Sequence, residues 1–193
     1  MDTVKSAMNA IEALHTRESA AKVQDPAPDD GALDAILQAA VRAPDHGRLR
    51  PWRFIAIRGE ALNRFGDVLA DTLQARSPDA TPDMLARERA KALRAPLIVV
   101  VAAHVQRGGK IPEIEQVLSS GAAAQNIMLA AHAMGYGAMW KTGDPAYDPR
   151  VKQALGLQED DAIVAFIYLG TNTGGPRPTP RPTAREFLTE WRG

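Results

Sequence analysis

One short stretch of this chain, from Arg42 to Arg53, is rich in positively charged residues, although the chain as a whole has no net charge. It contains Arg42, Arg48, Arg50 and Arg53 together with His46, whereas the whole chain has 23 basic and 23 acidic residues. A local excess of cations in a neutral protein is typical of a site that holds one anion. Guanidinium groups bind phosphate and carboxylate groups through paired, charged hydrogen bonds. The stretch therefore predicts an anion-binding site.

A second candidate lies near the N-terminus, where Arg17-Glu18-Ser19 follows Thr16. An arginine and a serine two positions apart on extended chain point to the same side. A forked cation beside a hydroxyl suits a phosphate monoester. Each residue also has a structural explanation, because Arg17 can be solvated, Ser19 can turn a loop and Arg42 can satisfy the end of a helix. Spacing alone leaves both explanations open.

The helices and strands that position these residues are predicted from hydrophobic periodicity and from the places of glycine and proline in the sequence. A helix capped by Asp29 or Asp30 and ended by Pro44 leads into the cation-rich stretch, and the continuously apolar segment Leu97 to Ala103 predicts a strand covered on both faces. A helix from Pro112 to Met134 has small residues at its centre, which favours close approach to another backbone. The other predicted elements are helices at Val4–Leu14, Leu62–Leu73, Thr81–Leu93, Asp148–Gly156 and Thr183–Trp191, and strands at Trp52–Arg58, Ala138–Lys141 and Ala162–Leu169. The helix Thr81–Leu93 is highly charged, so we expect it to lie on the surface, and Thr183 and Glu186 have capping-box spacing.

Composition excludes several classes of function. The chain has no cysteine, which rules out disulfides, thiolate nucleophiles and cysteine-ligated zinc. None of its four histidines is paired at metal-ligand spacing, and the zero net charge gives no field for nucleic acid. We expect no metal, no nucleic acid and no membrane partner. The N-terminal segment lacks a secretory pattern and no apolar run reaches the ~18 residues of a membrane helix, so we expect one cytoplasmic domain over residues 1–193.

Two fragments imitate a serine acyl-transferase. Ser19-Ala20-Ala21-Lys22 matches S-x-x-K, and Lys141-Thr142-Gly143 matches K-T-G. That chemistry needs the serine and the lysine one turn apart at the start of a helix. Pro26 and Pro28 leave no room for such a helix, and the S-D-N element is missing. Phosphate-binding P-loop and Rossmann patterns are missing as well.

The order of the remaining motifs is more specific than any one of them. Along the chain stand Arg17-Glu18-Ser19, Pro26-Ala27-Pro28, Arg42-Ala43-Pro44-Asp45-His46, Pro51-Trp52-Arg53-Phe54, Arg94-Ala95-Pro96-Leu97-Ile98, Ile111-Pro112, Glu115-Gln116, Gly135-Tyr136-Gly137, Trp140-Lys141-Thr142-Gly143 and Tyr168-Leu169-Gly170-Thr171. This series closely resembles the nitroreductase family, in particular its short branch of NAD(P)H nitroreductases. The resemblance covers the chain from about Met1 to Thr171.

The resemblance implies an α+β fold with a central mixed β-sheet flanked by helices, in an intertwined homodimer with FMN at the subunit interface. By the family's pattern, Arg17, Glu18 and Ser19 of one subunit hold the phosphate and ribityl end of the flavin. Arg42 and His46 reach the same flavin from the other subunit. Trp140, Lys141 and Thr142 line the flavin from the strand after the long helix. The stretch matching the NAD(P)H region is Ala130, Ala131, His132, Ala133, Met134 and Gly135.

The function implied by the resemblance is an FMN-dependent NAD(P)H oxidoreductase. Hydride would pass through the flavin by ping-pong turnover to nitroaromatic or quinone-like acceptors. No catalytic side chain is expected, because N5 of the flavin itself carries the hydride. The alternative is a protein that binds FMN for storage or sensing with little turnover. The Pro/Arg-rich tail, residues 171–193, has little counterpart in the family, and we expect it to pack on the partner subunit.

Overall fold

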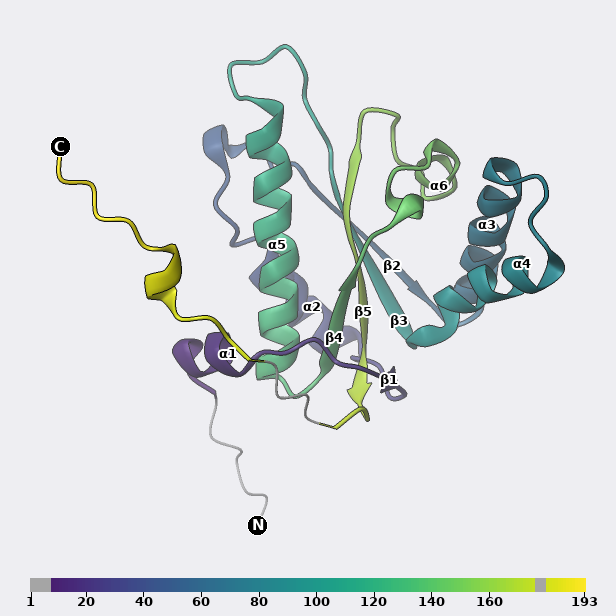
Figure 1. Cartoon of the computed structure of the whole chain (residues 1–193), viewed down its shortest axis with the longest axis horizontal. Coiled ribbons are helices and arrows are strands. Elements are labelled where there is room, and N and C mark those ends of the chain that lie inside the picture. Colours follow the sequence, from purple (N-terminus) through teal and green to yellow (C-terminus); the bar gives the residue numbers. More distant parts are fainter. Residues whose placement is uncertain (1–7, 176–179) are drawn as a thin grey trace.

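An antiparallel β-sheet between two groups of helices forms the body of the protein in the computed structural model, which describes residues 8–175 and 180–193 (Figure 1). The strands are β1 (Val23–Gln24), β2 (Trp52–Arg58), β3 (Leu97–Ala103), β4 (Gly137–Lys141) and β5 (Ala162–Asn172). The α-helices are α1 (Ala10–Thr16), α2 (Asp30–Ala40), α3 (Glu60–Arg76), α4 (Pro82–Arg89), α5 (Glu113–Ala133) and α6 (Pro149–Ala154). Short 3-10 helices are η1 (His46–Arg48), η2 (Ala90–Arg94), η3 (Asp144–Ala146) and η4 (Ala184–Phe187).

The sheet differs from the expected mixed sheet, because every strand pairing among the described residues is antiparallel. β3 lies between β2 and β5, and β5 also pairs with β4 and with the short β1. A long helical connection usually carries the chain across to a parallel strand. Here α3 and the α4–η2 segment run out and back, so that β3 starts where β2 ended, with Arg58 opposite Leu97. The prediction of a mixed sheet was therefore wrong, while the α+β class with flanking helices is confirmed.

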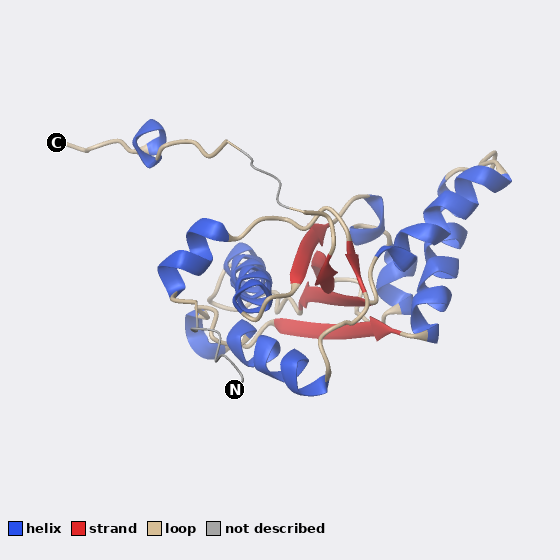
Figure 2. Cartoon of the chain, turned by 90° about the horizontal axis from the view of Figure 1, so that it is seen from below, coloured by secondary structure: helices blue, strands red, loops and turns tan. Residues whose placement is uncertain are grey.

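The two faces of the sheet form two separate cores. All seven residues of β3 are buried, as its continuous apolar run predicted. Leu97, Val99 and Val101 belong to the core under α2 and α5. Ile98 and Val100 alternate with them and belong to the core under α3 and α6. Figures 1 and 2 show these helix groups on opposite sides of the sheet.

The long helix α5 lies at the centre of the fold, as its small side chains predicted. Ser120, Ala123 and Ala124 are fully buried. Asn126 also donates from its side-chain amide to the carbonyl of Ala39 at 3.1 Å, which ties α5 to α2. The predicted N-cap of α2 is confirmed as well, since the Asp29 carboxylate accepts a hydrogen bond from the Ala32 amide at 2.8 Å. The packing of α2 on α5 therefore sets the position in space of the start of the cation-rich stretch.

The C-terminal tail does not form the helix predicted for Thr183 to Trp191. Only the single turn η4 is present, although the predicted capping box between Thr183 and Glu186 does form. Phe187, Leu188 and Trp191 are 76%, 65% and 91% exposed, and the tail runs away from the body (Figure 2). An isolated turn without packing gains too little to propagate into a longer helix. These apolar residues of the tail therefore pack against nothing in the described part of their own chain.

Neither a membrane-spanning helix nor a metal site is found in residues 8–175 and 180–193. The longest helix, α5, has 21 residues, but Glu113 and Glu115 lie in its first turn. No helix in these ranges is long and apolar enough to cross a bilayer. The same ranges contain no group of three or more acidic or histidine side chains that could hold a metal ion.

Candidate functional site

Arg17 presents a buried hydrogen-bond donor that the described residues leave unsatisfied. It lies directly after α1, and its Nη1 atom is buried without a partner in the described part of the chain. Arg181 of the C-terminal tail donates from Nη2 to the carbonyl oxygen of Arg17 at 3.0 Å. Burial first, and then the charge of Arg181, lower the pKa of Arg17, while Glu18 acts in the opposite direction. A buried unpaired donor costs about 1–3 kcal/mol, so this place favours an anion.

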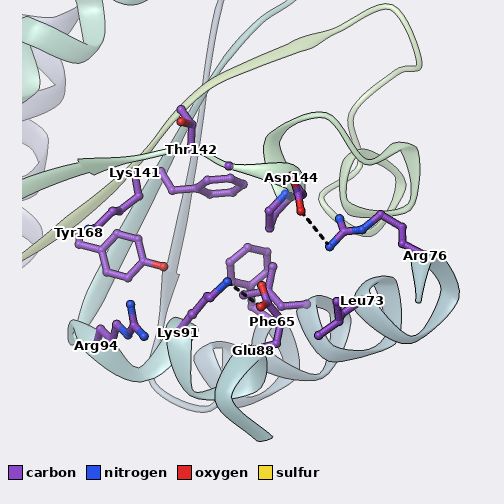
Figure 3. Close-up of a pocket in the computed structure, with 14 residues that line it drawn as sticks. Phe65, Leu73, Arg76, Glu88, Lys91, Arg94, Lys141, Thr142, Asp144 and Tyr168 are labelled. Carbon is purple, nitrogen blue, oxygen red and sulfur yellow. Dashed lines mark ion pairs between the residues drawn. The ribbon is translucent and has the colours of Figure 1, made fainter. Parts of the chain in front are cut away.

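A cavity of about 350 Å³ opens between α3, η2 and the end of β4 (Figure 3). Lys141 and Thr142, both predicted for the flavin, line it from the end of β4 and the turn that follows. Its walls are apolar and its rim is charged, a composition common in sites for small aromatic ligands. The other lining residues are Phe65, Leu69, Leu73, Arg76, Glu88, Lys91, Arg94, Gly143, Asp144, Pro145, Phe166 and Tyr168.

Within the described residues, two of the cations around this cavity have no partner. Lys91 is paired with Glu88 at 2.6 Å, and Arg76 lies 3.6 Å from Asp144 (Figure 3). The side chains of Arg94 and Lys141 take part in no hydrogen bond or ion pair among the described residues. The cavity therefore offers two available cations to a polar or anionic edge of a ligand.

A second, smaller cavity links this site to the chain near Arg17. It has a volume of about 110 Å³ and is lined on one side by residues 20–23, which follow Ser19. Arg94, Lys141 and Tyr168 line both cavities. The segment that follows the first candidate site, at Arg17, thus lies beside the second candidate site, at Lys141.

Tyr168 contributes a hydroxyl group at the junction of the two cavities. The residue is only 8% exposed. Burial raises its pKa above the usual tyrosine value; Arg94 opposes this and Glu88 adds to it. Tyr168 therefore stays protonated at neutral pH and can donate a hydrogen bond to a ligand.

Trp140 and Lys141, two residues of the predicted trio, lie on β4 and point to opposite faces of the sheet. Successive side chains of a strand point to opposite faces. Met139 packs on the α3 side, and Lys141 lines both cavities on that same side. Trp140 instead packs against the core under α5. The structure thus places Lys141 and Thr142 in the cavity and the Trp140 side chain away from it.

The cation-rich stretch is anchored on α5 rather than in this cavity. Nδ1 of His46 lies 2.6 Å from Oε2 of Glu115. Trp52 donates from Nε1 to the hydroxyl of Ser119 at 2.9 Å, and that hydroxyl donates to the carbonyl of Pro44 at 2.7 Å. Arg42 and His46 are exposed, and neither lines the cavity of Lys141. Their contact with a flavin held by another subunit stays a prediction.

The predicted NAD(P)H stretch, residues 130–135, forms the C-terminal end of α5 and the turn after it. Ala131 is buried in the core, whereas Ala133, Met134 and Gly135 are exposed. Nε2 of His132 lies 2.9 Å from the hydroxyl of Thr16, which itself donates to the carbonyl of Glu12. This contact joins α1 to α5. A nucleotide site here stays a prediction.

The acyl-transferase pattern gains no support from the structure. Residues 17–22 lie outside any helix, so Ser19 and Lys22 are not held one helical turn apart. Ser19 does not line the cavity that contains Lys141-Thr142-Gly143. The two fragments of the pattern therefore do not form one site.

Four site residues were not identified from the sequence. Arg94 and Tyr168 each fall within a motif of the resemblance, which was the available signal. Lys91 belongs to a charged segment for which we expected only a surface role. Arg181 lies in the tail, for which the sequence offered no counterpart. Tertiary contacts bring all four residues to the site, and hydrophobic periodicity does not predict such contacts.

Gly137 keeps the segment after Ser19 against β4. A Cβ atom added there would lie 2.8 Å from Val23 Cγ1, 2.9 Å from Asn172 Cβ and 3.0 Å from Ala20 Cβ. We expect Gly137→Ala to destabilise the fold by about 1–3 kcal/mol in urea denaturation, because these neighbours must move apart. Gly109→Ala is the control, since nothing lies within 4 Å of its added Cβ. Equal stability of the two variants would contradict this packing.

Comparison with known proteins gives the family of the chain. The model of the nitroreductase family matches residues 14–171. This chain belongs to the nitroreductase family. The resemblance predicted from the motifs is confirmed, and its boundary at Thr171 coincides with the end of the match.

Several relatives match over nearly their whole length. "Putative NAD(P)H nitroreductase YdjA" of Escherichia coli K12 is 40% identical over 181 residues, covering 90% of this chain and 97% of that protein. A "Putative NAD(P)H nitroreductase" of Haemophilus influenzae is 35% identical over 165 residues, covering 85% of this chain and 89% of that protein.

Solved structures support the fold. A nitroreductase-like family protein from Bacillus cereus matches with a TM-score of 0.82 and 24% identity, covering 100% of both chains. A nitroreductase from Desulfovibrio desulfuricans, solved in complex with FMN, matches with a TM-score of 0.73 and 28% identity, covering 96% of this chain and 98% of that chain. The first of these is evidence for the fold alone.

Proposed function

We propose that this protein is an FMN-dependent NAD(P)H oxidoreductase that reduces nitroaromatic or quinone-like acceptors. The observation that carries the proposal is the buried Nη1 of Arg17, which has no partner among the described residues and lies near the charge of Arg181. Two adjacent cations with an unsatisfied donor are unfavourable until an anion lies between them. The FMN complex of the Desulfovibrio relative supports a flavin as the molecule that supplies this anion.

The residues present fit an FMN molecule along its length. Arg17, Ser19 and Arg181 would hold the phosphate. Lys141, Arg94 and the Tyr168 hydroxyl, which line both cavities, would donate to the polar edge of the ring system. FMN, when bound, supplies the hydride chemistry, accepting a hydride from the nicotinamide and delivering it to the second substrate. The apolar wall of the larger cavity excludes water from that edge.

The second subunit completes the site in this proposal. Arg42 and His46 would approach the flavin from the partner chain. Ile114 and Leu118 are 61% and 63% exposed on the same helix that anchors the loop of these residues. Large apolar side chains exposed one helical turn apart are typical of an interface. A homodimer through the first half of α5 is therefore part of the proposal.

Turnover is proposed to be ping-pong, with the oxidised nicotinamide leaving before the acceptor enters. The alternative function, storage or sensing of FMN, shares the binding site and differs only in the rate of reduction. Purified protein should be yellow, and NADPH or NADH should bleach its absorbance under anaerobic conditions in a stopped-flow instrument. A nitroaromatic acceptor should then restore the colour.

The outcomes separate these functions. Protein that stays colourless and cannot be loaded with FMN contradicts the flavin proposal altogether. Protein that binds FMN but is not reduced by either nicotinamide supports the storage or sensing function instead. The predicted cytoplasmic location is a separate prediction that this experiment does not address.

A further inference from the structure

Four arginines gather around a surface depression that the proposed flavin phosphate site does not use. The depression has a volume of about 670 Å³ and lies where the chain passes from α2 into β2. Arg42, Arg48, Arg50 and Arg53 line it, with Asp45 as the one carboxylate. In a chain of zero net charge, this is a strongly cationic surface. We call Arg48 and Arg50 together the arginine pair.

Asp45 shapes the loop rather than neutralising its cations. Its Oδ2 accepts a hydrogen bond from the backbone amide of Arg50 at 2.8 Å, and its carbonyl accepts from the amide of Arg48 at 3.3 Å. The side chains of the arginine pair take part in no hydrogen bond or ion pair within residues 8–175 and 180–193. Arg53 differs, because its Nη1 donates to the carbonyls of Arg50 and Trp52 at 3.2 and 2.9 Å.

The backbone of the arginine pair is held in an unfavourable conformation. Arg48 and Arg50 have φ angles of 56° and 49°, and among the described residues no other non-glycine residue has a positive φ. Left-handed conformations of such residues persist where the surrounding structure imposes them, and they cluster at ligand sites. The adjoining Gly47 allows this loop to lie against Ile111, because an added Cβ would come within 3 Å of that side chain. The loop thus carries, on a defined backbone, two guanidinium groups that have no partner among the described residues.

We propose that the arginine pair binds the phosphate monoester of NADPH and makes the protein prefer NADPH to NADH. The inference rests on the proposed function. FMN has one phosphate, which is assigned to Arg17, whereas NADPH brings an additional monoester on its ribose. Forked cations bind a dianionic phosphate better than they bind a ribose hydroxyl. The same loop carries Arg42 and His46, which are proposed to reach the flavin of the other subunit, where the hydride donor must also lie.

Adenosine 2′,5′-bisphosphate tests the site without turnover. FMN-loaded protein is titrated with it and with adenosine 5′-monophosphate by isothermal titration calorimetry. We expect the double variant Arg48→Gln/Arg50→Gln to bind the bisphosphate at least about tenfold more weakly, because charged hydrogen bonds are lost. The kcat/KM ratio of NADPH to NADH should fall by a similar factor. Arg64→Gln, at an exposed arginine of α3 outside the depression, is the matched control and should change either value by less than about twofold.

The results test the arginine site independently of the flavin proposal. Unchanged bisphosphate affinity and an unchanged NADPH to NADH ratio in the double variant overturn the arginine site, even if FMN binds and is reduced. If the wild-type chain does not hold FMN, the proposed function fails, and the titration is run on the flavin-free protein. Loss of bisphosphate binding in the double variant then still supports the site. Far-UV circular dichroism should be the same for all variants, because these side chains are exposed.

Discussion

Replacing Arg17 by alanine is expected to lower the affinity for FMN by about 10- to 150-fold. The variant removes a charged hydrogen-bond donor, and such bonds contribute about 1.5–3 kcal/mol. Nη1 of Arg17 is buried without a partner in the described residues, so an anion is its natural acceptor. Quenching of flavin fluorescence during titration of FMN measures the dissociation constant directly.

The same variant should not weaken the flavin-free fold. Arg17 is partly desolvated and lies close to the charge of Arg181, and both effects lower its pKa. Removing the cation relieves both of these unfavourable contributions. We therefore expect the melting temperature of flavin-free Arg17→Ala to equal or exceed that of the wild type. A structural arginine would give the opposite sign, which makes this measurement diagnostic.

Two further variants complete the test of the phosphate assignment. Arg64→Ala, on the exposed side of α3, is the matched control and should leave FMN affinity within about twofold. Arg42→Ala should weaken FMN, because the proposal places this residue against the flavin of the other subunit. Wild-type affinity in both Arg17→Ala and Arg42→Ala would contradict the assignment.

The strands and the long helix could be predicted from the sequence because their signals are local. The bounds of β2 and β3 agree with the predicted ranges, and α5 differs by one residue at each end. A run such as Leu97 to Ala103 has few alternatives to a strand buried on both faces. The mixed sheet implied by the resemblance was wrong for this chain, because the direction of β3 relative to β2 depends on how α3 and α4 pack together. The sequence of either helix alone does not indicate that together they return the chain to the same end of the sheet.

The candidate site was predicted only where its residues lie within motifs. Arg17, Lys141 and Thr142 were identified in this way, and the fold brings the segment after Ser19 and the end of β4 to one pair of cavities. Trp140 was grouped with Lys141 by the motif, although strand alternation places its side chain on the other face. Lys91 and Arg181 reach the site from segments far away in sequence, where no short pattern marks a ligand contact.

The partner of His46 shows how tertiary structure adds to a motif. The sequence placed His46 and Glu115 in separate motifs, yet their side chains meet at 2.6 Å. With Nδ1 held by the carboxylate, only Nε2 is available to a ligand. The loop of Arg42 is thus fixed to the first half of α5, beside the exposed Ile114 and Leu118. The proposed flavin contacts and the proposed dimer interface are therefore parts of one surface.

Replacing Leu118 by lysine is expected to convert the protein from a dimer to a monomer and to release FMN. Leu118 is 63% exposed in the single chain, one helical turn after Ile114. Covering a lysine in an apolar interface costs several kcal/mol, since its charge loses water without gaining a partner. A monomer would withdraw Arg42 and His46 from the flavin of the other subunit, so affinity should fall together with assembly. Size-exclusion chromatography with light scattering measures the mass, and fluorescence titration measures FMN binding.

The control for this variant is Met84→Lys, which adds the same charge on α4 at the opposite side of the sheet. Met84 is 46% exposed, and α4 lies far from α5 (Figure 1). This variant should remain dimeric and retain FMN, because a surface lysine changes stability by less than about 0.5 kcal/mol. A Leu118→Lys protein with the same mass and FMN affinity as Met84→Lys would mean that α5 is not the interface. Arg42 and His46 would then have to act within their own chain, where His46 already pairs with Glu115 and neither residue lines the cavity of Lys141.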